Sequence, residues 1–300
     1  MAMHSDQASP LRKTRFENSK LNAIGVEVLT FGDLMKKVPD ERLTIPERVE
    51  LYLLLMVTSG NLVHTLDFVD YKLPAGSLVV VRPGQVQQWH PTTEAEAQIV
   101  LVDPTALPFD AAVSHTRELE LLTLFDWQPQ TQLSHELQTK LEQVTDRLES
   151  DIAGFDGSEL EISLIRHELL ALLFRLACFQ RDLVQNQTTR TAGYEKYKLF
   201  VELLEQHYRN EHALQFYARR LGYSTSTLSR ACLEIEGYSA KVVIDHRIAL
   251  EGKRMLAHSG ASVAEIAYYL GFSEATNFIK FFKRIVQLTP TEFRDTRSGR

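Results

Sequence analysis

The stretch of sequence that decides the fold runs from Leu214 to Arg294 and reads LQFYARRLGYSTSTLSRACLEIEGYSAKVVIDHRIALEGKRMLAHSGASVAEIAYYLGFSEATNFIKFFKRIVQLTPTEFR. One pattern occurs in it twice. An amphipathic segment carries an alanine four residues before a glycine, small polar residues follow, and a large apolar residue comes six or seven positions after the glycine. The two copies are Ala218, Gly222 and Leu228, and Ala267, Gly271 and Phe278.

Each residue type in this pattern meets a need of two helices that cross at a steep angle. Alanine lets the helices approach closely, glycine adopts the positive φ of a tight turn, and the large apolar residue anchors the second helix from inside. The pattern therefore predicts a helix-turn-helix. Two copies in tandem are a much stronger signal than one.

This segment resembles the DNA-binding domain of the AraC/XylS family of transcription regulators, over roughly the last third of the chain. The resemblance is carried by Leu221–Ser224, Leu228–Arg230, Gly237–Ser239, Arg247-Ile248, Ala264–Ala267, Leu270–Phe272, Phe278, Phe281–Arg284 and Thr289–Arg294. Three positions depart from the family's pattern: His212 in place of a Ser or Thr cap, Gly252 in place of Ala, and Gln287-Leu288 in place of a Gly-x pair.

The resemblance implies an α+β chain. Its expected parts are an N-terminal cupin-like β-barrel, a helical dimerisation segment and a C-terminal all-α domain with two helix-turn-helix motifs. It also implies a sequence-specific transcription regulator, more often an activator than a repressor, controlled by a small-molecule effector in the barrel. The expected partners are double-stranded DNA, the effector, a second copy of the chain and RNA polymerase. Neither an enzymatic activity nor a cofactor is expected.

Length and composition agree with a two-domain intracellular protein. The chain has 300 residues, 44% of them hydrophobic, which is enough for two cores. Its two cysteines, Cys178 and Cys232, exclude a disulfide framework and fit a reducing compartment. No apolar run reaches membrane-spanning length, and the first 19 residues lack a signal-peptide core. We therefore expect a soluble, cytoplasmic protein.

The net charge of −6 is divided unevenly along the chain. Residues 194–300 carry 16 Lys and Arg against 12 Asp and Glu, whereas residues 1–193 carry 17 against 27. The C-terminal part is therefore net positive although the whole chain is acidic. Because contact with phosphate needs only local positive charge, the acidic total does not exclude DNA binding.

The predicted domain organisation has five parts. They are a flexible N-terminus (1–20), a cupin-like effector-binding domain (21–134), a helical dimerisation segment (135–184), a linker (185–193) and the DNA-binding domain (194–300). In the second part we predict a buried strand over Val49–Val57, a turn at Ser59–Asn61, an alternating strand over Leu62–Phe68 and another strand over Gln98–Val102. Between them, the run LPAGSLVVVRPG at 73–84 resembles the jelly roll of the family's effector domain.

Two helical stripes are expected after the strands. Apolar residues recur at helical spacing at Leu137, Leu141, Val144 and Leu148, and again at Ile165, Leu169, Leu172 and Leu176. These stripes either pack against the barrel or form the seam of a dimer, and the sequence leaves both interpretations open. The polar run QNQTTRTAG that follows indicates a flexible connector.

The outward faces of the two recognition helices are the predicted DNA contacts. We expect the first such helix to begin near Thr225 with Ser224 as its N-cap, and with Leu228 and Cys232 facing inward. The predicted contacts are Ser224, Thr225, Ser226, Ser229, Arg230, Lys241, Ala275, Thr276, Asn277, Lys280, Lys283 and Arg284.

Two of these residues are suited to reading bases. The guanidinium of Arg230 can contact guanine O6 and N7 together, and the amide of Asn277 can pair with adenine. Arg230 is alternatively a phosphate contact or simply exposed, and Asn277 alternatively caps or braces the helix. Hydroxyls and lysines more often contact phosphate.

A single helix from Ser239 to Ala257 is expected to join the two motifs, and Ser262 and Glu265 form a capping box for the next helix. A stiff connector fixes the separation of the recognition helices. Both would then enter the major groove about one turn, roughly 34 Å, apart.

Neither a metal site nor a catalytic set is recognisable. Two scattered histidines, with glutamines where a metal-binding cupin needs His, do not make a metal triad, and both cysteines are interpreted as core thiols. The residues expected to line the barrel interior are Leu53, Leu55, His64, Leu66, Val80, Arg82, Trp89 and His90. Arg82 and the histidines suit a carboxylate or a phenol.

Three hypotheses remain at this point. The run Arg247–Arg254 resembles family members that respond to hydroxylated aromatic acids, which favours a regulator with an aromatic-acid effector. The alternatives are a cupin-type metalloenzyme with a DNA-binding domain and an effector-independent dimeric DNA-binding protein.

Overall fold

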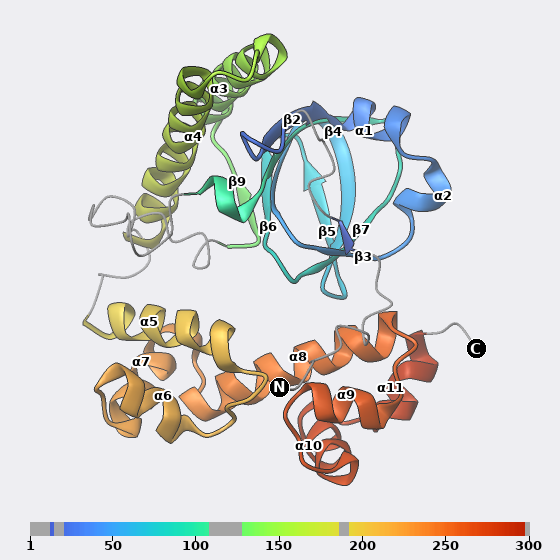
Figure 1. Cartoon of the computed structure of the whole chain (residues 1–300), viewed down its shortest axis with the longest axis vertical. Coiled ribbons are helices and arrows are strands. Elements are labelled where there is room, and N and C mark those ends of the chain that lie inside the picture. Colours follow the sequence, from blue (N-terminus) through green and yellow to red (C-terminus); the bar gives the residue numbers. More distant parts are fainter. Residues whose placement is uncertain (1–12, 15–20, 108–127, 186–191, 298–300) are drawn as a thin grey trace. The chain divides into compact units, whose positions relative to one another are not determined.

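The computed structural model describes residues 13–14, 21–107, 128–185 and 192–297. The chain forms two compact units, Arg12–Val184 and Gln185–Arg300 (Figure 1). Predicted features within 1–12, 15–20, 108–127, 186–191 and 298–300, including most of the flexible N-terminus and of the linker, lie outside the described residues.

The N-terminal unit is built on a curled sheet. Its described strands are β1 (Lys13–Thr14), β2 (Val26–Thr30), β3 (Glu47–Val49), β4 (Tyr52–Leu66), β5 (Val69–Pro74), β6 (Ser77–Val81), β7 (Val86–Trp89), β8 (Ala95–Val102) and β9 (Gln130–Gln132). Every strand pairing among the described residues is antiparallel except that of β1 with β3. The valine-rich β6 is bracketed by turns at Ala75-Gly76 and Pro83-Gly84, as the sequence predicts.

Strand β4 holds this sheet together. Over its 15 residues it pairs with β8 and β6 in its first half and with β5 and β7 in its second half. The register shifts between Val57 and Ser59, and Gly60 has a φ of +73°. The predicted turn at Ser59–Asn61 is therefore wrong, because these residues continue β4 and pair with β8 and β5, and the bulge lies just before them. A side chain at Gly60 would overlap the backbone carbonyl of Glu94.

The sequence pattern does not predict three features of this unit. The helices α1 (Phe31–Lys37) and α2 (Asp40–Leu43) interrupt the expected run of strands. Lys13–Thr14, within the predicted flexible terminus, pair with β3. The chain reverses after Leu66 through Asp67 and Phe68, both at positive φ, which a bulky aromatic residue rarely adopts.

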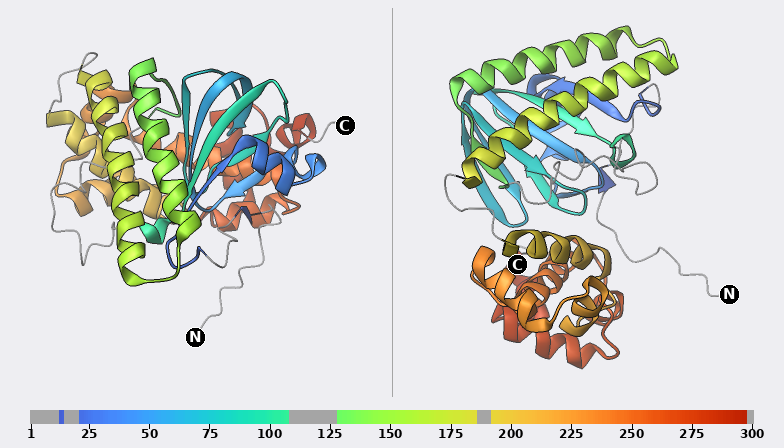
Figure 2. Two further views of the ribbon diagram at one scale, coloured as in Figure 1. Left: turned by 90° about the horizontal axis from the view of Figure 1, so that it is seen from above. Right: turned by 90° about the vertical axis from the view of Figure 1, so that its left-hand side faces the viewer.

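The curled sheet forms a half-barrel, and each of its two faces contributes to a separate hydrophobic core. Leu53, Leu55 and Val57 of β4 point into the half-barrel, whereas Tyr52, Leu54 and Met56 face the opposite way. The helices α3 (His135–Gly154) and α4 (Glu159–Gln185) run across this second face (Figure 2).

Both predicted apolar stripes belong to the core between these helices and the sheet. Leu141 and Leu148 of α3 and Leu169, Leu172 and Leu176 of α4 are fully buried there. Packing against the sheet, the first of the two interpretations, is confirmed. A dimer seam would have to use another face. Cys178 lies off the buried stripe of α4 and is exposed, so its prediction as a core thiol is wrong.

The C-terminal unit is helical in its described residues. Its helices are α5 (Ala192–His207), α6 (Leu214–Leu221), α7 (Thr225–Glu236), α8 (Ala240–His258), α9 (Val263–Tyr269), α10 (Ala275–Val286) and α11 (Pro290–Arg297). Helices α6 and α7 lie at one end of α8, and α9 and α10 lie towards its other end (Figure 1).

Both helix-turn-helix motifs are confirmed. Gly222 and Gly271 have φ values of +71° and +78°, and Ala218 and Ala267 are buried. The single connecting helix α8 and the capping box of Ser262 with Glu265 are confirmed as well.

The three departures from the family pattern have visible consequences. Helix α6 begins at the cap Ala213 without a side-chain hydrogen bond. A Cβ on Gly252 would lie 3.3 Å from the Phe278 ring, so the glycine lets α10 pack tightly on α8. Gln287 takes the left-handed cap conformation, φ +64°, that a glycine adopts at lower cost.

Candidate DNA-binding surface and half-barrel interior

The first recognition helix, α7, begins at a cluster of hydroxyls. The Ser224 hydroxyl accepts a hydrogen bond from the Thr227 backbone N–H at 3.1 Å, and it lies 2.8 Å from the hydroxyls of both Ser226 and Thr227. Leu228 and Cys232 are fully buried. Burial raises the pKa of the Cys232 thiol to about 12, so it stays protonated and packs as an apolar group.

The opposite face of α7 is open to solvent. Ser226 and Arg230 are exposed, while Thr225 and Ser229 are half-buried. Among the described residues the Arg230 guanidinium has no hydrogen-bond or ion-pair partner. Its five donors are therefore available to a ligand.

The second recognition helix, α10, follows the same plan. Phe278 and Phe282 are buried, Thr276, Asn277 and Lys280 are exposed, and Ala275 is half-buried. The residue that caps the helix is Glu274, so Asn277 is not the cap. Within the described part of the chain, the Asn277 amide has no hydrogen-bond partner, which leaves it free to contact a base.

Three cations of the predicted surface are exposed at the ends of helices α8 and α10, and two of them share one acid. Lys241 Nζ lies 2.6 Å from one carboxylate oxygen of Asp245, and an Arg284 guanidinium nitrogen lies 3.2 Å from the other. Lys283 is exposed beside them in the sequence. The nearly buried Asp245 offsets part of the charge that Lys241 and Arg284 offer to phosphate, which the sequence alone does not reveal.

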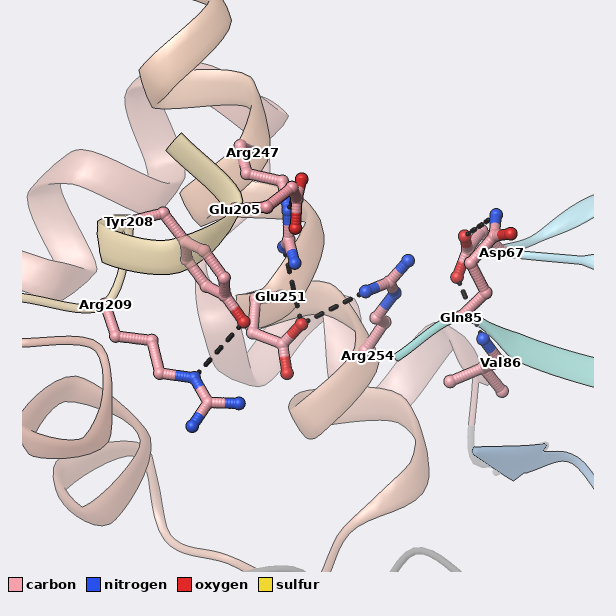
Figure 3. A network of polar contacts seen from close by, with 9 residues as sticks. All are labelled: Asp67, Gln85, Val86, Glu205, Tyr208, Arg209, Arg247, Glu251 and Arg254. Carbon is pink, nitrogen blue, oxygen red and sulfur yellow. Dashed lines mark hydrogen bonds and ion pairs between the residues drawn. The ribbon is translucent and has the colours of Figure 1, made fainter. Parts of the chain in front are cut away.

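A buried ion-pair network ties α5 to α8 (Figure 3). Arg247 Nε lies 2.7 Å from Glu205, and a second Arg247 nitrogen lies 3.4 Å from Glu251, which Arg254 also contacts at 3.1 Å. Burial acts to lower the pKa of Arg247, but Glu205, Tyr208 and Glu251 together outweigh it and raise the pKa. The network fixes α5 on the connecting helix α8.

The connection between α5 and α6 contacts the second motif. The Arg209 guanidinium lies 4.6 Å from the centre of the Tyr269 ring, and the His212 and Phe272 rings are 4.8 Å apart. Gly271, in the turn of the second motif, packs against the Arg209 backbone where a side chain would not fit. The two helix-turn-helix motifs are thus joined by α8 and also by the contacts of Arg209 and His212 with the second motif.

The half-barrel interior brings together only part of the predicted lining. Leu53, Leu55, Leu66 and Trp89 belong to its apolar core, and His64 stacks on Trp89 with the ring centres 4.4 Å apart. Val80 faces α3 and α4 instead, so its predicted place in the lining is wrong.

The other two predicted effector contacts lie elsewhere on the sheet. His90 contacts the hydroxyl of Thr65 at 2.7 Å, and strand alternation places Thr65 on the face of β4 opposite to His64. Arg82 is half-buried near Tyr52. Burial raises the pKa of Tyr52 to about 12, and the charge of Arg82 opposes that rise.

Among the described residues, no group of three or more His, Cys, Asp or Glu side chains is placed to hold a metal ion. No helix in the same residues has the length and apolar character needed to cross a membrane.

Comparisons with known proteins cover both units. Residues 217–296 match a helix-turn-helix domain family, and residues 38–170 match the AraC-like ligand binding domain family. The HTH-type transcriptional activator RhaS of Escherichia coli is 23% identical over 249 residues, which cover 82% of this chain and 86% of that protein.

Two solved structures are similar to parts of this chain, both with TM-scores below 0.5. ToxT from Vibrio cholerae is 11% identical with a TM-score of 0.40, over 92% of this chain and 99% of that one. The C-terminal domain of the response regulator yesN from Fusobacterium nucleatum is 24% identical with a TM-score of 0.31, over 32% of this chain and 95% of that one. The two family matches, together with the RhaS relatives, show that this chain belongs to the AraC/XylS family and is a DNA-binding transcription regulator with a ligand-binding domain.

Proposed function

We propose that the chain is a transcription activator that binds DNA as a homodimer and is controlled by a small molecule held inside the half-barrel. The observation that carries the DNA-binding part is the pair of exposed faces on α7 and α10, joined by the single helix α8. Activation, and with it contact to RNA polymerase, is supported by the RhaS relatives, which are named activators.

The two exposed faces divide base reading between them. On α7, Arg230 is the group suited to guanine, and on α10, Asn277 is the group suited to adenine. Lys280 and Lys283 supply phosphate contacts. Lys241 and Arg284 contribute less charge each, because they share the Asp245 carboxylate.

A binding-site selection followed by fluorescence anisotropy tests these roles. Arg230→Ala and Asn277→Ala should each relax the preference at one base position by about 1–3 kcal/mol. The matched control is Lys283→Ala, which should weaken all sequences equally and reduce the salt dependence by about one counterion. An unchanged base preference in both base-reading variants would reject the assignment.

We propose the outward face of α4 as the dimer seam. The inward stripe of α4 is buried in its own unit, whereas Leu160 and Leu164 are 83% and 51% exposed one turn apart. Isolated exposed leucines are common, but a pair at helical spacing suits a second copy of the same helix.

The effector is proposed to bind inside the half-barrel, where the ligand-binding family match lies. The Arg247–Arg254 run does not inform its identity. That run lies on α8, where Glu251 pairs with both Arg247 and Arg254. The hypothesis of an aromatic-acid effector therefore rests on resemblance alone. The chemical class of the effector has to be inferred from the interior of the half-barrel.

A further inference from the structure

One nearly buried carboxylate binds two cations that come from different helices. Asp245, on α8, is 6% exposed. One of its carboxylate oxygens lies 2.6 Å from Lys241 Nζ, one turn earlier on the same helix. The other oxygen lies 3.2 Å from a guanidinium nitrogen of Arg284 on α10. The positions of the two cations therefore depend on each other through a single side chain.

Each cation has a second anchor. Lys241 Nζ also donates to the backbone carbonyl of His212 at 3.1 Å, in the connection between α5 and α6. The Arg284 guanidinium lies 5.7 Å from the centre of the Phe281 ring on its own helix. Fixing a long cationic side chain costs rotamer freedom, and these contacts meet that cost within the folded protein. Both cations are thus held in place before any DNA arrives.

Both cations remain accessible while they are held. The side chains of Lys241 and Arg284 are 48% and 63% exposed, against 8% for Asp245. An ammonium has three donors and a guanidinium five, so each cation keeps donors for a phosphate while it is paired. A DNA backbone can therefore contact the cations but reaches little of the acid between them.

We propose that Asp245 is a positioning residue that makes DNA binding more selective. The inference rests on the phosphate contacts proposed for Lys241 and Arg284. With the acid in place, each cation reaches only a phosphate that the correct register of α7 and α10 brings to it. The acid also offsets part of the charge of both cations, which weakens binding to a duplex in any other register.

Non-specific binding depends most on free charge. It arises from the release of counterions, and a cation on a flexible side chain can follow the phosphate backbone in any register. The recognition helices, by contrast, distinguish one sequence from another through their base contacts. Freeing the two cations from Asp245 would therefore favour the wrong duplexes more than the correct one.

The test compares two duplexes by fluorescence anisotropy of the full-length protein at a series of salt concentrations. One duplex is the site obtained by binding-site selection, and the other is a scrambled sequence of the same length. Asp245→Asn and Asp245→Ser each remove the charge, and thermal midpoints identify the folded variants.

Either folded variant should bind the scrambled duplex about tenfold more tightly at about 0.1 M salt, the equivalent of one further phosphate contact, with a steeper dependence on salt. Affinity for the selected site should change by less than about threefold, because the lost positioning offsets the gained charge, so the specificity ratio falls.

Two control variants separate positioning from net charge. Asp245→Glu keeps the carboxylate and should keep the wild-type specificity ratio. Asp295→Asn changes the net charge by the same amount at an exposed position of α11, which contacts α8 near its other end through Arg294 and the Leu256 carbonyl. Its specificity ratio should also equal that of the wild type. A purely structural tie between α8 and α10 would change the thermal midpoint without steepening the salt dependence.

Three results would overturn the inference. They are unchanged or weaker binding of the scrambled duplex by the folded neutral variants, an equal gain in Asp295→Asn, and an equal gain on both duplexes. The second would mean that net charge alone acts, and the third that the acid only repels DNA. The phosphate contacts fail separately, if Lys241→Ala and Arg284→Ala bind both duplexes like the wild type.

Discussion

Arg209 holds its guanidinium 4.6 Å from the centre of the Tyr269 ring, which joins the connection between α5 and α6 to the last residue of α9. The contact connects the segment that follows the first helix of the DNA-binding unit to the second helix-turn-helix without passing through α8. Since the Arg209 side chain also donates to the Tyr208 hydroxyl at 3.2 Å, its position is fixed on both sides.

Removing this contact should loosen the spacing between the two recognition helices. We expect Arg209→Ala to cost about 0.5–2 kcal/mol of stability and to relax the dependence of binding on the distance between the two contacted DNA segments. Anisotropy with DNA sites lengthened or shortened by one base pair measures this. Arg209→Lys keeps a cation over the ring and is the control. Equal spacing dependence in the alanine variant and the wild type contradicts a coupling role.

The helix cap at Gln287 offers a stabilising change. A non-glycine residue in the left-handed conformation is strained by about 1 kcal/mol, so Gln287→Gly should raise the free energy of unfolding by about 0.5–1 kcal/mol. Urea denaturation measures the change. Gly271→Ala, at a left-handed turn with no room for a Cβ, should instead destabilise strongly. A loss of stability in Gln287→Gly would show that its amide contact to the Arg284 carbonyl outweighs the strain.

Acid should destabilise the N-terminal unit through His64. Its pKa is about 3 in the folded state against an ordinary value of 6.5, so the unfolded chain binds the extra proton between these limits. Stability from this group is complete above pH 6.5 and falls as pH drops, by about 1.4 kcal/mol per pH unit over the steepest part. Urea midpoints at a series of pH values should show a shallower fall for His64→Leu than for the wild type. Parallel curves would mean that the ring is protonated in the folded protein.

The proposed dimer seam is testable at two leucines. Leu160→Glu combined with Leu164→Glu should shift the protein from dimer to monomer in analytical ultracentrifugation, because two charges replace the apolar contact. Both positions are exposed, so the thermal midpoint of the monomer should change little. The control is Arg175→Glu, an exposed position farther along α4. A dimer that persists in the double variant places the seam elsewhere.

Local signals explain which parts of the fold are predictable from sequence. The turns at Gly222 and Gly271, the caps at Ser224 and Ser262 and the buried anchors depend on residues within a few positions of one another. The segment Ser59–Asn61 has the residue types of a turn, and only its pairing with β8, about 35 residues later, keeps it within a continuous strand.

The electrostatics of the site are less visible in the sequence for a similar reason. Arg247 pairs with Glu205 across 42 residues, and Arg284 pairs with Asp245 across 39. No spacing rule links such partners, so the sequence shows the cations of the DNA-binding surface without the acids that partly neutralise them. That Arg230 and Asn277 keep their side chains unpaired among the described residues, whereas Lys241 and Arg284 do not, is visible only in the structure.

Strand β4 gives the N-terminal unit one further property. Its alternate side chains belong to two different cores, one inside the half-barrel and one under α3 and α4. Any rearrangement around Leu53 and Leu55 therefore moves a backbone whose other side carries Leu54 and Met56. Because the two cores share this strand, a change of packing in one core alters the packing of the other.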